Sequence, residues 1–246
     1  MPEPELTESQ LMLRSAVREF LAREVAPICR ELERRPDPRD CMPWDLIRAG
    51  SRLGLRTLAL PESWGGAGAN VTTRAMVLAE MCQVEPGLAK CFYSCWRSSL
   101  LLYHLGTRAQ REKFLKPFAE DDAYCFSTAF TEPEAGSDNL IASDDPKRGL
   151  MLSAVRDGKN WVLNGRKQWV SLAGLSRSAL VFARTDPNLP VHRGSTLFIV
   201  PSDWPGVRFP RVDDKLGFRL YPNGDIALEN ARLPEDHRLG EVNGAW

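Results

Sequence analysis

The chain has 246 residues, 43% of them hydrophobic, which is enough to bury a sizeable core in one large or two modest domains. Its 32 basic and 32 acidic residues give a formal net charge of zero, so no electrostatic argument supports nucleic acid or an anionic membrane as a partner. The N-terminus is acidic and no apolar run is long enough to cross a bilayer, which predicts a cytoplasmic protein without membrane insertion.

The first half of the chain has helical periodicity. Thr7-Glu8-Ser9-Gln10 is a capping box, and the apolar spacing after it predicts a helix to about Glu33, bent at Pro27. A glycine-rich stretch over 55–68 predicts a loop. Further helices are expected over Trp44–Leu53, Val71–Val84 and Gly87–His104, and after a second capping box at Thr107–Gln110.

From Tyr124 onwards the periodicity becomes that of strands, separated by turn signals such as Asp157-Gly158. We therefore place a domain boundary near Asp121-Asp122, between a helical domain over 1–122 and a β domain over 123–246. Strands are expected over Met151–Arg156, Trp161–Leu163, Ala179–Arg184, Thr196–Val200 and Asp225–Leu228.

The cysteines and histidines give no metal-binding pattern. The six cysteines form no CxxC pair, and His104, His192 and His237 are far apart in the sequence. Cys91 and Cys95 would share one helix face, where we expect buried free thiols.

A first candidate site segment begins with a strand over Tyr124–Thr131 and continues into a turn at Pro133. Gly136 and Ser137 then follow with almost no side-chain bulk, so backbone amides can approach a ligand closely. Exposed amides beside a hydroxyl suit a pyrophosphate. The alternative is an ordinary strand that ends in a Gly/Ser turn.

A second candidate segment follows Asn164-Gly165, which is a strong hairpin turn signal. It predicts that Lys167–Ser171 returns as a strand with Trp169 and Ser171 on the same face. An aromatic ring beside a hydroxyl fits a planar cofactor, although Trp on a half-buried strand is more often part of the core.

These two segments, TEPEAGSD at Thr131–Asp138 and NGRKQWVSLAG at Asn164–Gly174, resemble the two signatures of the acyl-CoA dehydrogenase family. The resemblance implies an α+β fold, with an N-terminal all-α domain followed by a mostly antiparallel, sandwich or barrel-like middle β domain. It also implies a third, helical domain, which we expect to be missing from this chain. Other stretches follow in the family's order: LPESWGGAG from Leu60, LGTRAQREKFL from Leu105, FIVPSDWPGV from Phe198, DKLGFR from Asp214 and LPEDHRLGE from Leu233.

The resemblance implies an oxidoreductase of fatty acid metabolism that uses FAD to introduce a double bond next to the carbonyl of an acyl-CoA thioester. An electron-transfer flavoprotein or a similar carrier would accept the electrons, and the protein would be a homo-oligomer. The family's catalytic base is a glutamate from the missing domain, so no residue here is assigned as the base and the chain alone is expected to be inactive.

By the same resemblance, Phe130 and Thr131 would contact the flavin's pyrimidine edge and Trp169 would cover the ring system. The implied cofactor-binding set is Thr128, Ala129, Phe130, Thr131, Gly136, Ser137, Trp169, Val170 and Ser171. The implied substrate-binding set is Ser137, His192 and Arg193.

Two other functions stay open at this point. A flavin monooxygenase or oxidase of the same fold would pass electrons to oxygen instead of a carrier, and a non-catalytic flavin-binding or assembly subunit would need a partner chain. The polar stretch over 139–153 is longer than expected, so it is either a solvated surface loop or a segment that reshapes the acyl or CoA entrance. Trp161 and Trp204 are expected to be packing residues, and Arg219 an interface or structural residue.

Overall fold

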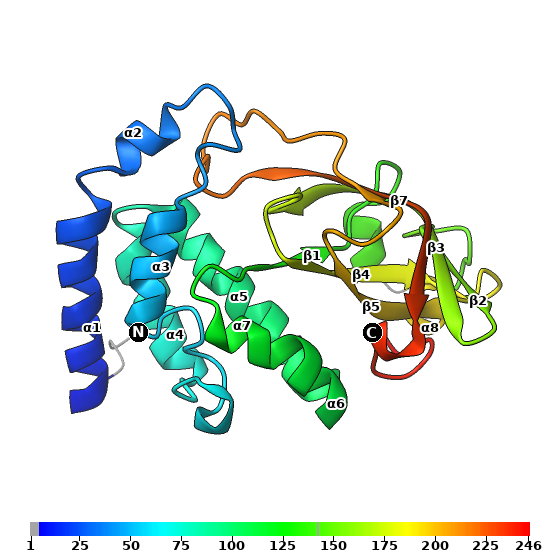
Figure 1. Cartoon of the computed structure of the whole chain (residues 1–246), viewed down its shortest axis with the longest axis horizontal. Helices are drawn as coiled ribbons and strands as arrows, with labels where there is room; N and C mark the ends of the chain where they lie inside the picture. Colours follow the sequence, from blue (N-terminus) through cyan, green and yellow to red (C-terminus); the bar gives the residue numbers. More distant parts are fainter. Residues whose placement is uncertain (1–4, 142) are drawn as a thin grey trace.

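The computed structural model describes residues 5–141 and 143–246, with most of the helices gathered on one side of the molecule and the strands on the other (Figure 1). No helix within these residues is long and apolar enough to cross a membrane. The helical side contains α1 (Glu8–Phe20), α2 (Cys29–Glu33), α3 (Trp44–Arg52), α4 (Val71–Cys82), α5 (Pro86–Leu105), α6 (Arg108–Gln110) and α7 (Lys116–Glu120).

The start of the first helix is confirmed, but its length is not. Thr7 and Gln10 form the capping box reciprocally, and α1 continues through a π-helical turn over Leu21–Val25. A turn then separates this segment from α2, so the predicted single helix to Glu33 is wrong. Pro27 lies at the break, where its missing N–H and fixed φ interrupt the helix instead of bending it.

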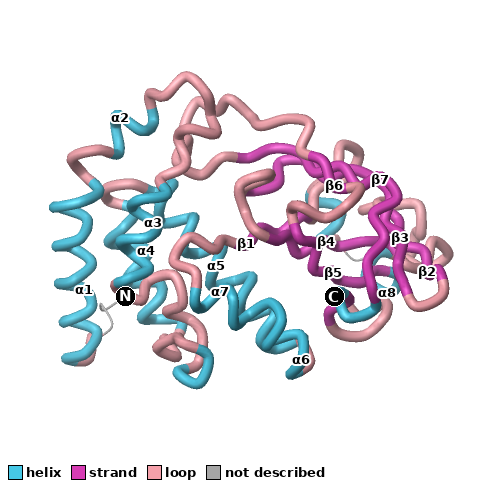
Figure 2. The backbone as a smooth tube through the Cα atoms, in the orientation of Figure 1, coloured by secondary structure: helices cyan, strands magenta, loops and turns pink. Residues whose placement is uncertain are grey.

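The strands form one eight-stranded sheet in the order β6-β7-β3-β2-β4-β5-β8, with β1 pairing alongside β4. The β1–β4 and β2–β4 pairs are parallel, while the other pairs are antiparallel, which confirms the mostly antiparallel sheet. Figure 2 shows the strands in magenta, gathered in the part of the molecule away from α1. The strands are β1 (Phe126–Ala129), β2 (Ser153–Asp157), β3 (Asn160–Ser171), β4 (Ser178–Arg184), β5 (Ser195–Pro201), β6 (Val207–Arg208), β7 (Asn223–Pro234) and β8 (Arg238–Leu239), with a short helix α8 (Val191–Gly194) before β5.

The hairpin turn predicted at Asn164-Gly165 is wrong, because β3 runs through both residues without reversing. The ladder between β3 and β7 shifts register here, and the side-chain oxygen of Asn164 accepts a hydrogen bond from Asn230 N at 2.8 Å. Gly165 has a φ of +138°, and a Cβ at this position would lie 2.9 Å from the Cα of Leu152. The Asn-Gly pair therefore accommodates a bulge in the neighbouring strand.

Apolar side chains cover both faces of the sheet. In β4, Leu180 packs into the core formed with the helices, whereas Val181 packs into a second core among the strands. Leu197 and Phe198 of β5 divide in the same way, as the two-residue side-chain period of a strand requires. The helices are thus fixed against one face of the sheet, and α5 lies next to β1 (Figure 1).

Candidate functional site

The strand of the first candidate segment, β1, pairs with β4 in the sheet and packs against α5, the longest helix. Ala129 is fully buried and pairs with Val181 of β4, while Thr128 is half-buried. The hydroxyl of Thr128 lies 3.1 Å from the hydroxyl of Ser98 on α5. The helical side of the protein therefore positions the strand that leads into the predicted flavin-binding residues.

The two candidate segments meet where β1 ends. The backbone carbonyl of Thr131 accepts a hydrogen bond from Gln168 N at 2.8 Å. The side chain of Lys167 reaches the same place and donates to the carbonyl oxygen of Phe130 at 3.0 Å. Two segments that are distant in the sequence are therefore joined, directly before the exposed residue Trp169.

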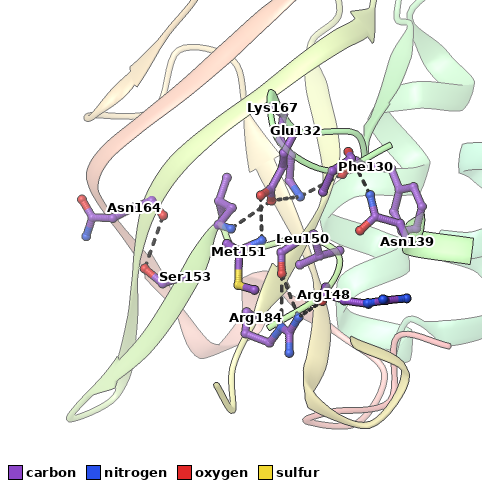
Figure 3. A network of polar contacts seen from close by, with 12 residues as sticks. Phe130, Glu132, Asn139, Arg148, Leu150, Met151, Ser153, Asn164, Lys167 and Arg184 are labelled. Carbon is purple, nitrogen blue, oxygen red and sulfur yellow. Dashed lines mark hydrogen bonds and ion pairs between the residues drawn. The ribbon is translucent and has the colours of Figure 1, made fainter. Parts of the chain in front are cut away.

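A buried ion pair, which the sequence reasoning missed, fixes this junction. Nζ of Lys167 lies 2.7 Å from Oε1 of Glu132, and the residues are 0% and 8% exposed (Figure 3). The Glu132 carboxylate also accepts hydrogen bonds from Met151 N at 2.6 Å and Leu152 N at 2.9 Å. Burial lowers the pKa of Lys167 to about 8, against the opposing effect of Glu132.

Trp169 is unusually exposed for a tryptophan, with 55% of its surface accessible. It has a φ of 58° and lies in a register shift of β3, so the strict alternation expected for Trp169 and Ser171 does not hold. The guanidinium of Arg211 lies 4.9 Å from the ring centroid, and Asn223 Nδ2 donates to the Trp169 carbonyl at 2.9 Å. The indole ring is therefore held by its surroundings while a large part of it stays accessible.

The two residues after Trp169 turn back into the protein. Val170 is buried, and Ser171 is half-buried at the end of β3. The nearby Tyr221 hydroxyl forms a hydrogen bond with Ser94 of α5. Burial raises the pKa of Tyr221 to about 12, although its contacts with Ser171 and Ser94 and the charge of Arg97 act in the opposite direction.

Gly136 and Ser137 are exposed after a tight turn in which Glu132 and Ala135 pair through their backbones. The amide of Gly136 donates to Oδ1 of Asp138 at 2.7 Å, so it is engaged by the chain itself. A Cβ added at Gly136 would meet nothing within 4 Å. The expected turn is confirmed, and open space lies beside it.

His192 and Arg193 lie on α8, where His192 is half-buried and Arg193 is exposed. Arg193 pairs with Asp144 of the polar insert at 3.3 Å. The insert also runs close to the Ser137 turn, because a Cβ at Gly149 would lie 2.2 Å from a side-chain carbon of Val191 and 3.1 Å from Oδ1 of Asn139. The predicted substrate residues are therefore on neighbouring segments.

Arg184 is a second buried feature that the sequence did not reveal. Its guanidinium donates to the carbonyl oxygens of Arg148 at 2.9 Å, Leu150 at 3.0 Å and Leu189 at 2.6 Å. Burial lowers its pKa, with the charges of Glu132 and Asp186 acting the other way. The polar insert is thus anchored to β4 by one buried side chain (Figure 3).

The remaining predictions about single residues have clear outcomes. Trp161 is buried and donates from Nε1 to Glu235 at 2.7 Å, and the half-buried Trp204 packs against the second core, so both are packing residues as expected. Arg219 has a structural contact, because it donates to the carbonyls of Glu33 at 2.6 Å and Arg35 at 2.8 Å. Cys91 and Cys95 are buried free thiols.

Comparison with known proteins agrees with this architecture. The sequence matches the family descriptions "Acyl-CoA dehydrogenase, N-terminal domain" over residues 7–122 and "Acyl-CoA dehydrogenase, middle domain" over residues 127–231. The chain belongs to the acyl-CoA dehydrogenase family.

Two curated relatives and one solved structure show how far the similarity extends. The chain is 32% identical to a 3-(aryl)acrylate reductase of Clostridium sporogenes, covering 96% of this chain and 59% of that protein. It is also 32% identical to the human mitochondrial short-chain specific acyl-CoA dehydrogenase, covering 96% and 54% of the two chains. An acyl-CoA dehydrogenase complexed with FAD from Bacillus anthracis is 26% identical, with a TM-score of 0.84 over 99% of this chain and 40% of that chain. This chain therefore spans a little over half the length of these two curated relatives.

Proposed function

We propose that this chain is the flavin-holding part of an FAD-dependent acyl-CoA dehydrogenase. The observation that carries the proposal is the junction at the end of β1, where Thr131 O accepts from Gln168 N at 2.8 Å and Lys167 holds the Phe130 carbonyl. It brings the two signature segments together and leaves Trp169 accessible beside them. When bound, FAD supplies a ring that takes up a hydride from the acyl carbon chain.

The residues present fit the flavin ring. Half-buried Thr131 offers a backbone and a hydroxyl beside Phe130, which suits the polar pyrimidine edge. The accessible surface of Trp169 suits the rest of the ring system, and Val170 is buried next to it in the chain. We assign to half-buried Ser171 a hydroxyl or amide near the hydride-accepting position. Neutral donors and one aromatic surface are the groups that such a cofactor needs.

The proposed contacts with the pyrophosphate and with the acyl-CoA rest on open space beside the chain and on charge. Gly136 and Ser137 are exposed next to free volume, and we assign them to the pyrophosphate. Ser137, His192 and Arg193 lie on segments that the polar insert brings together, and we assign them to the acyl-CoA. No residue of this chain is assigned to proton removal.

The proposal extends to the partners of the protein. Electrons would pass to an electron-transfer flavoprotein or a similar acceptor, in keeping with the family resemblance. A homo-oligomer is supported by large apolar side chains that are exposed in this chain, namely Leu140, Ile141, Met151, Val155, Leu216 and Phe218.

The visible absorption spectrum of the purified chain tests the proposal, followed by denaturation to identify any released flavin. FAD at about one per chain is the expected result. A colourless chain that takes up no added FAD would contradict the proposal, and flavin reoxidation that needs only oxygen would favour an oxidase instead.

A further inference from the structure

Trp169 has a backbone conformation that a bulky side chain does not favour. Its φ of 58° lies in the left-handed region, where such a residue is rarely found unless the surrounding structure fixes it. Burial does not fix this residue, because 55% of its surface is accessible. Specific contacts must therefore hold its backbone and its ring.

A cation lies over the indole ring. The guanidinium carbon of Arg211 is 4.9 Å from the ring centroid of Trp169, within the range in which a cation is attracted to an aromatic face. Nε of Arg211 is shielded from water and has no hydrogen-bond partner within residues 5–141 and 143–246. The guanidinium thus lies over the ring although one of its N–H groups is left unsatisfied there.

Two acidic side chains keep Arg211 beside the ring. Its Nη2 lies 3.1 Å from Oδ1 of Asp213 and donates to Oδ1 of Asp225 at 3.4 Å. Asp225 is fully buried, and its amide donates to the Arg211 carbonyl at 3.0 Å. The backbone and the charge of Arg211 are therefore both tied to the body of the sheet.

A second contact holds the Trp169 backbone. Nδ2 of Asn223 donates to the Trp169 carbonyl at 2.9 Å, and Oδ1 of Asn223 accepts from Nζ of Lys215 at 2.7 Å. Nζ of Lys215 also donates to the carbonyl of Tyr221 at 2.6 Å, so it stays in place beside Asn223. The segment 211–225 thus contacts Trp169 at two points, the ring and the carbonyl.

We propose that Arg211 is a positioning residue that sets the angle of the Trp169 ring, so that the ring face opposite the guanidinium can stack on the flavin. The inference rests on the proposed function, which assigns Trp169 to the flavin ring, and it gives Arg211 itself no contact with the cofactor. Stacking of flat rings depends on their angle and offset. A side chain that is already held in one orientation also loses less entropy when a ligand binds.

The orientation of the indole can be measured without any flavin. The chain is labelled with 5-fluorotryptophan, so that its seven tryptophans give fluorine resonances, and Trp169→Phe identifies the resonance of Trp169. Arg211→Met removes the charge but keeps most of the aliphatic volume, and Arg211→Lys keeps the charge. Arg208→Met is the matched control, because Arg208 lies nearby on β6 and also pairs with a carboxylate, that of Glu229 at 2.9 Å. Urea denaturation shows whether each variant folds.

In Arg211→Met, the Trp169 resonance should move toward its position in the unfolded chain, because the ring then samples several orientations, while the other resonances stay in place. Arg211→Lys should retain most of the wild-type displacement, and Arg208→Met all of it. An unchanged Trp169 resonance in Arg211→Met would overturn the inference, as would a similar shift of every resonance, which would show a general change of the fold. An Arg211→Lys spectrum equal to that of Arg211→Met would also overturn it, because the cation would then have no role.

The effect on the cofactor is measured by the visible circular dichroism of bound FAD and by titrations with FAD and with ADP. Arg211→Met should alter the flavin dichroism and weaken FAD on the order of threefold, which corresponds to one exposed cation–π contact. Binding of ADP, which has the pyrophosphate but no flavin ring, should not change. Equal weakening of ADP and FAD would show that Arg211 contacts the pyrophosphate, and the inference would be wrong.

The two measurements separate this inference from the proposed function. A wild-type chain that holds no FAD contradicts the proposed function, and the fluorine spectra still decide whether Arg211 orients Trp169. A chain that holds FAD with the same dichroism in wild type and in Arg211→Met contradicts only the role of Arg211.

Discussion

Lys167 and Glu132 are joined by an ion pair of 2.7 Å that is shielded from water and lies directly behind the junction of the two signature segments. The lysine also holds the Phe130 carbonyl, and the carboxylate also holds two backbone amides immediately before β2. One pair of charges thus fixes β1, β2 and β3 relative to one another. Such a pair repays the cost of desolvation only with further hydrogen bonds, and here each of the two charged groups makes at least one beyond the ion pair.

Replacement of Lys167 by Met should lower the free energy of unfolding by about 3–5 kcal/mol, because the Glu132 carboxylate would stay buried without its counter-ion. The double variant Lys167→Met/Glu132→Gln should recover part of this loss, since no unpaired charge is left. Urea denaturation followed by circular dichroism measures both changes.

The exposed pair of Arg23 and Glu19, 2.8 Å apart with side chains 78% and 60% exposed, provides the control. Arg23→Met should change the free energy of unfolding by less than about 1 kcal/mol. Equal effects of Lys167→Met and Arg23→Met would show that the buried pair has no special role.

The Lys167 amine should make the stability depend on pH in the alkaline range. Burial lowers its pKa from 10.5 to about 8, so between these values the unfolded chain binds more protons at this residue than the folded chain. The contribution of Lys167 to the free energy of unfolding therefore rises as the pH increases from about 8 to 10.5. The difference in unfolding free energy between wild type and Lys167→Met should widen over this range, whereas a constant difference would argue against the shift.

Arg184 should control access to the polar insert. Arg184→Leu leaves the carbonyl oxygens of Arg148, Leu150 and Leu189 without their donors, so the insert should open more often. Limited digestion with trypsin should then cut after Lys147 and Arg148 on the order of tenfold faster. Arg193→Leu removes only an exposed pair with Asp144 and should leave the rate nearly unchanged. A similar rate in all three proteins would contradict this role.

His237 should make the protein less stable in mild acid. It is fully buried, Nδ1 donates to Ile199 O at 2.9 Å, and burial lowers its pKa below 6.5. The unfolded chain thus binds more protons as the pH falls below 6.5, and the free energy of unfolding decreases. His237→Phe should lose less stability than wild type between pH 7.5 and 5.5, while a substitution of the exposed His104 should behave like wild type. Urea denaturation at pH 7.5 and 5.5 measures the loss of unfolding free energy for each protein. Identical losses for the His237 and His104 variants would contradict the role given to His237.

The features that the sequence predicted well depend on neighbouring residues. The capping boxes at Thr7 and Thr107 both form, because each needs only residues within one helical turn. The tight turn after Glu132 and the change from helices to strands follow in the same way from local composition.

The features that were missed depend on residues far away in the sequence. Asn164-Gly165 has the composition of a hairpin turn, but its partner is Asn230 on β7, and that contact converts the signal into a bulge. Glu132 and Lys167 each look like ordinary polar residues, and only the folded sheet brings their charges together away from water. The family was recognised from its motifs, whereas the ion pair beside the candidate site required the structure.

The central claim is that the two signature segments hold one flavin. An absorbance titration of FAD into wild type, Thr131→Val and Trp169→Ala tests this claim most directly, with Trp64→Ala as a control at a half-buried tryptophan elsewhere. We expect saturation at about one FAD per chain, affinity weakened on the order of tenfold by each site variant, and little change in the control. Binding that both site variants leave unchanged, or no saturable binding at all, would contradict the account.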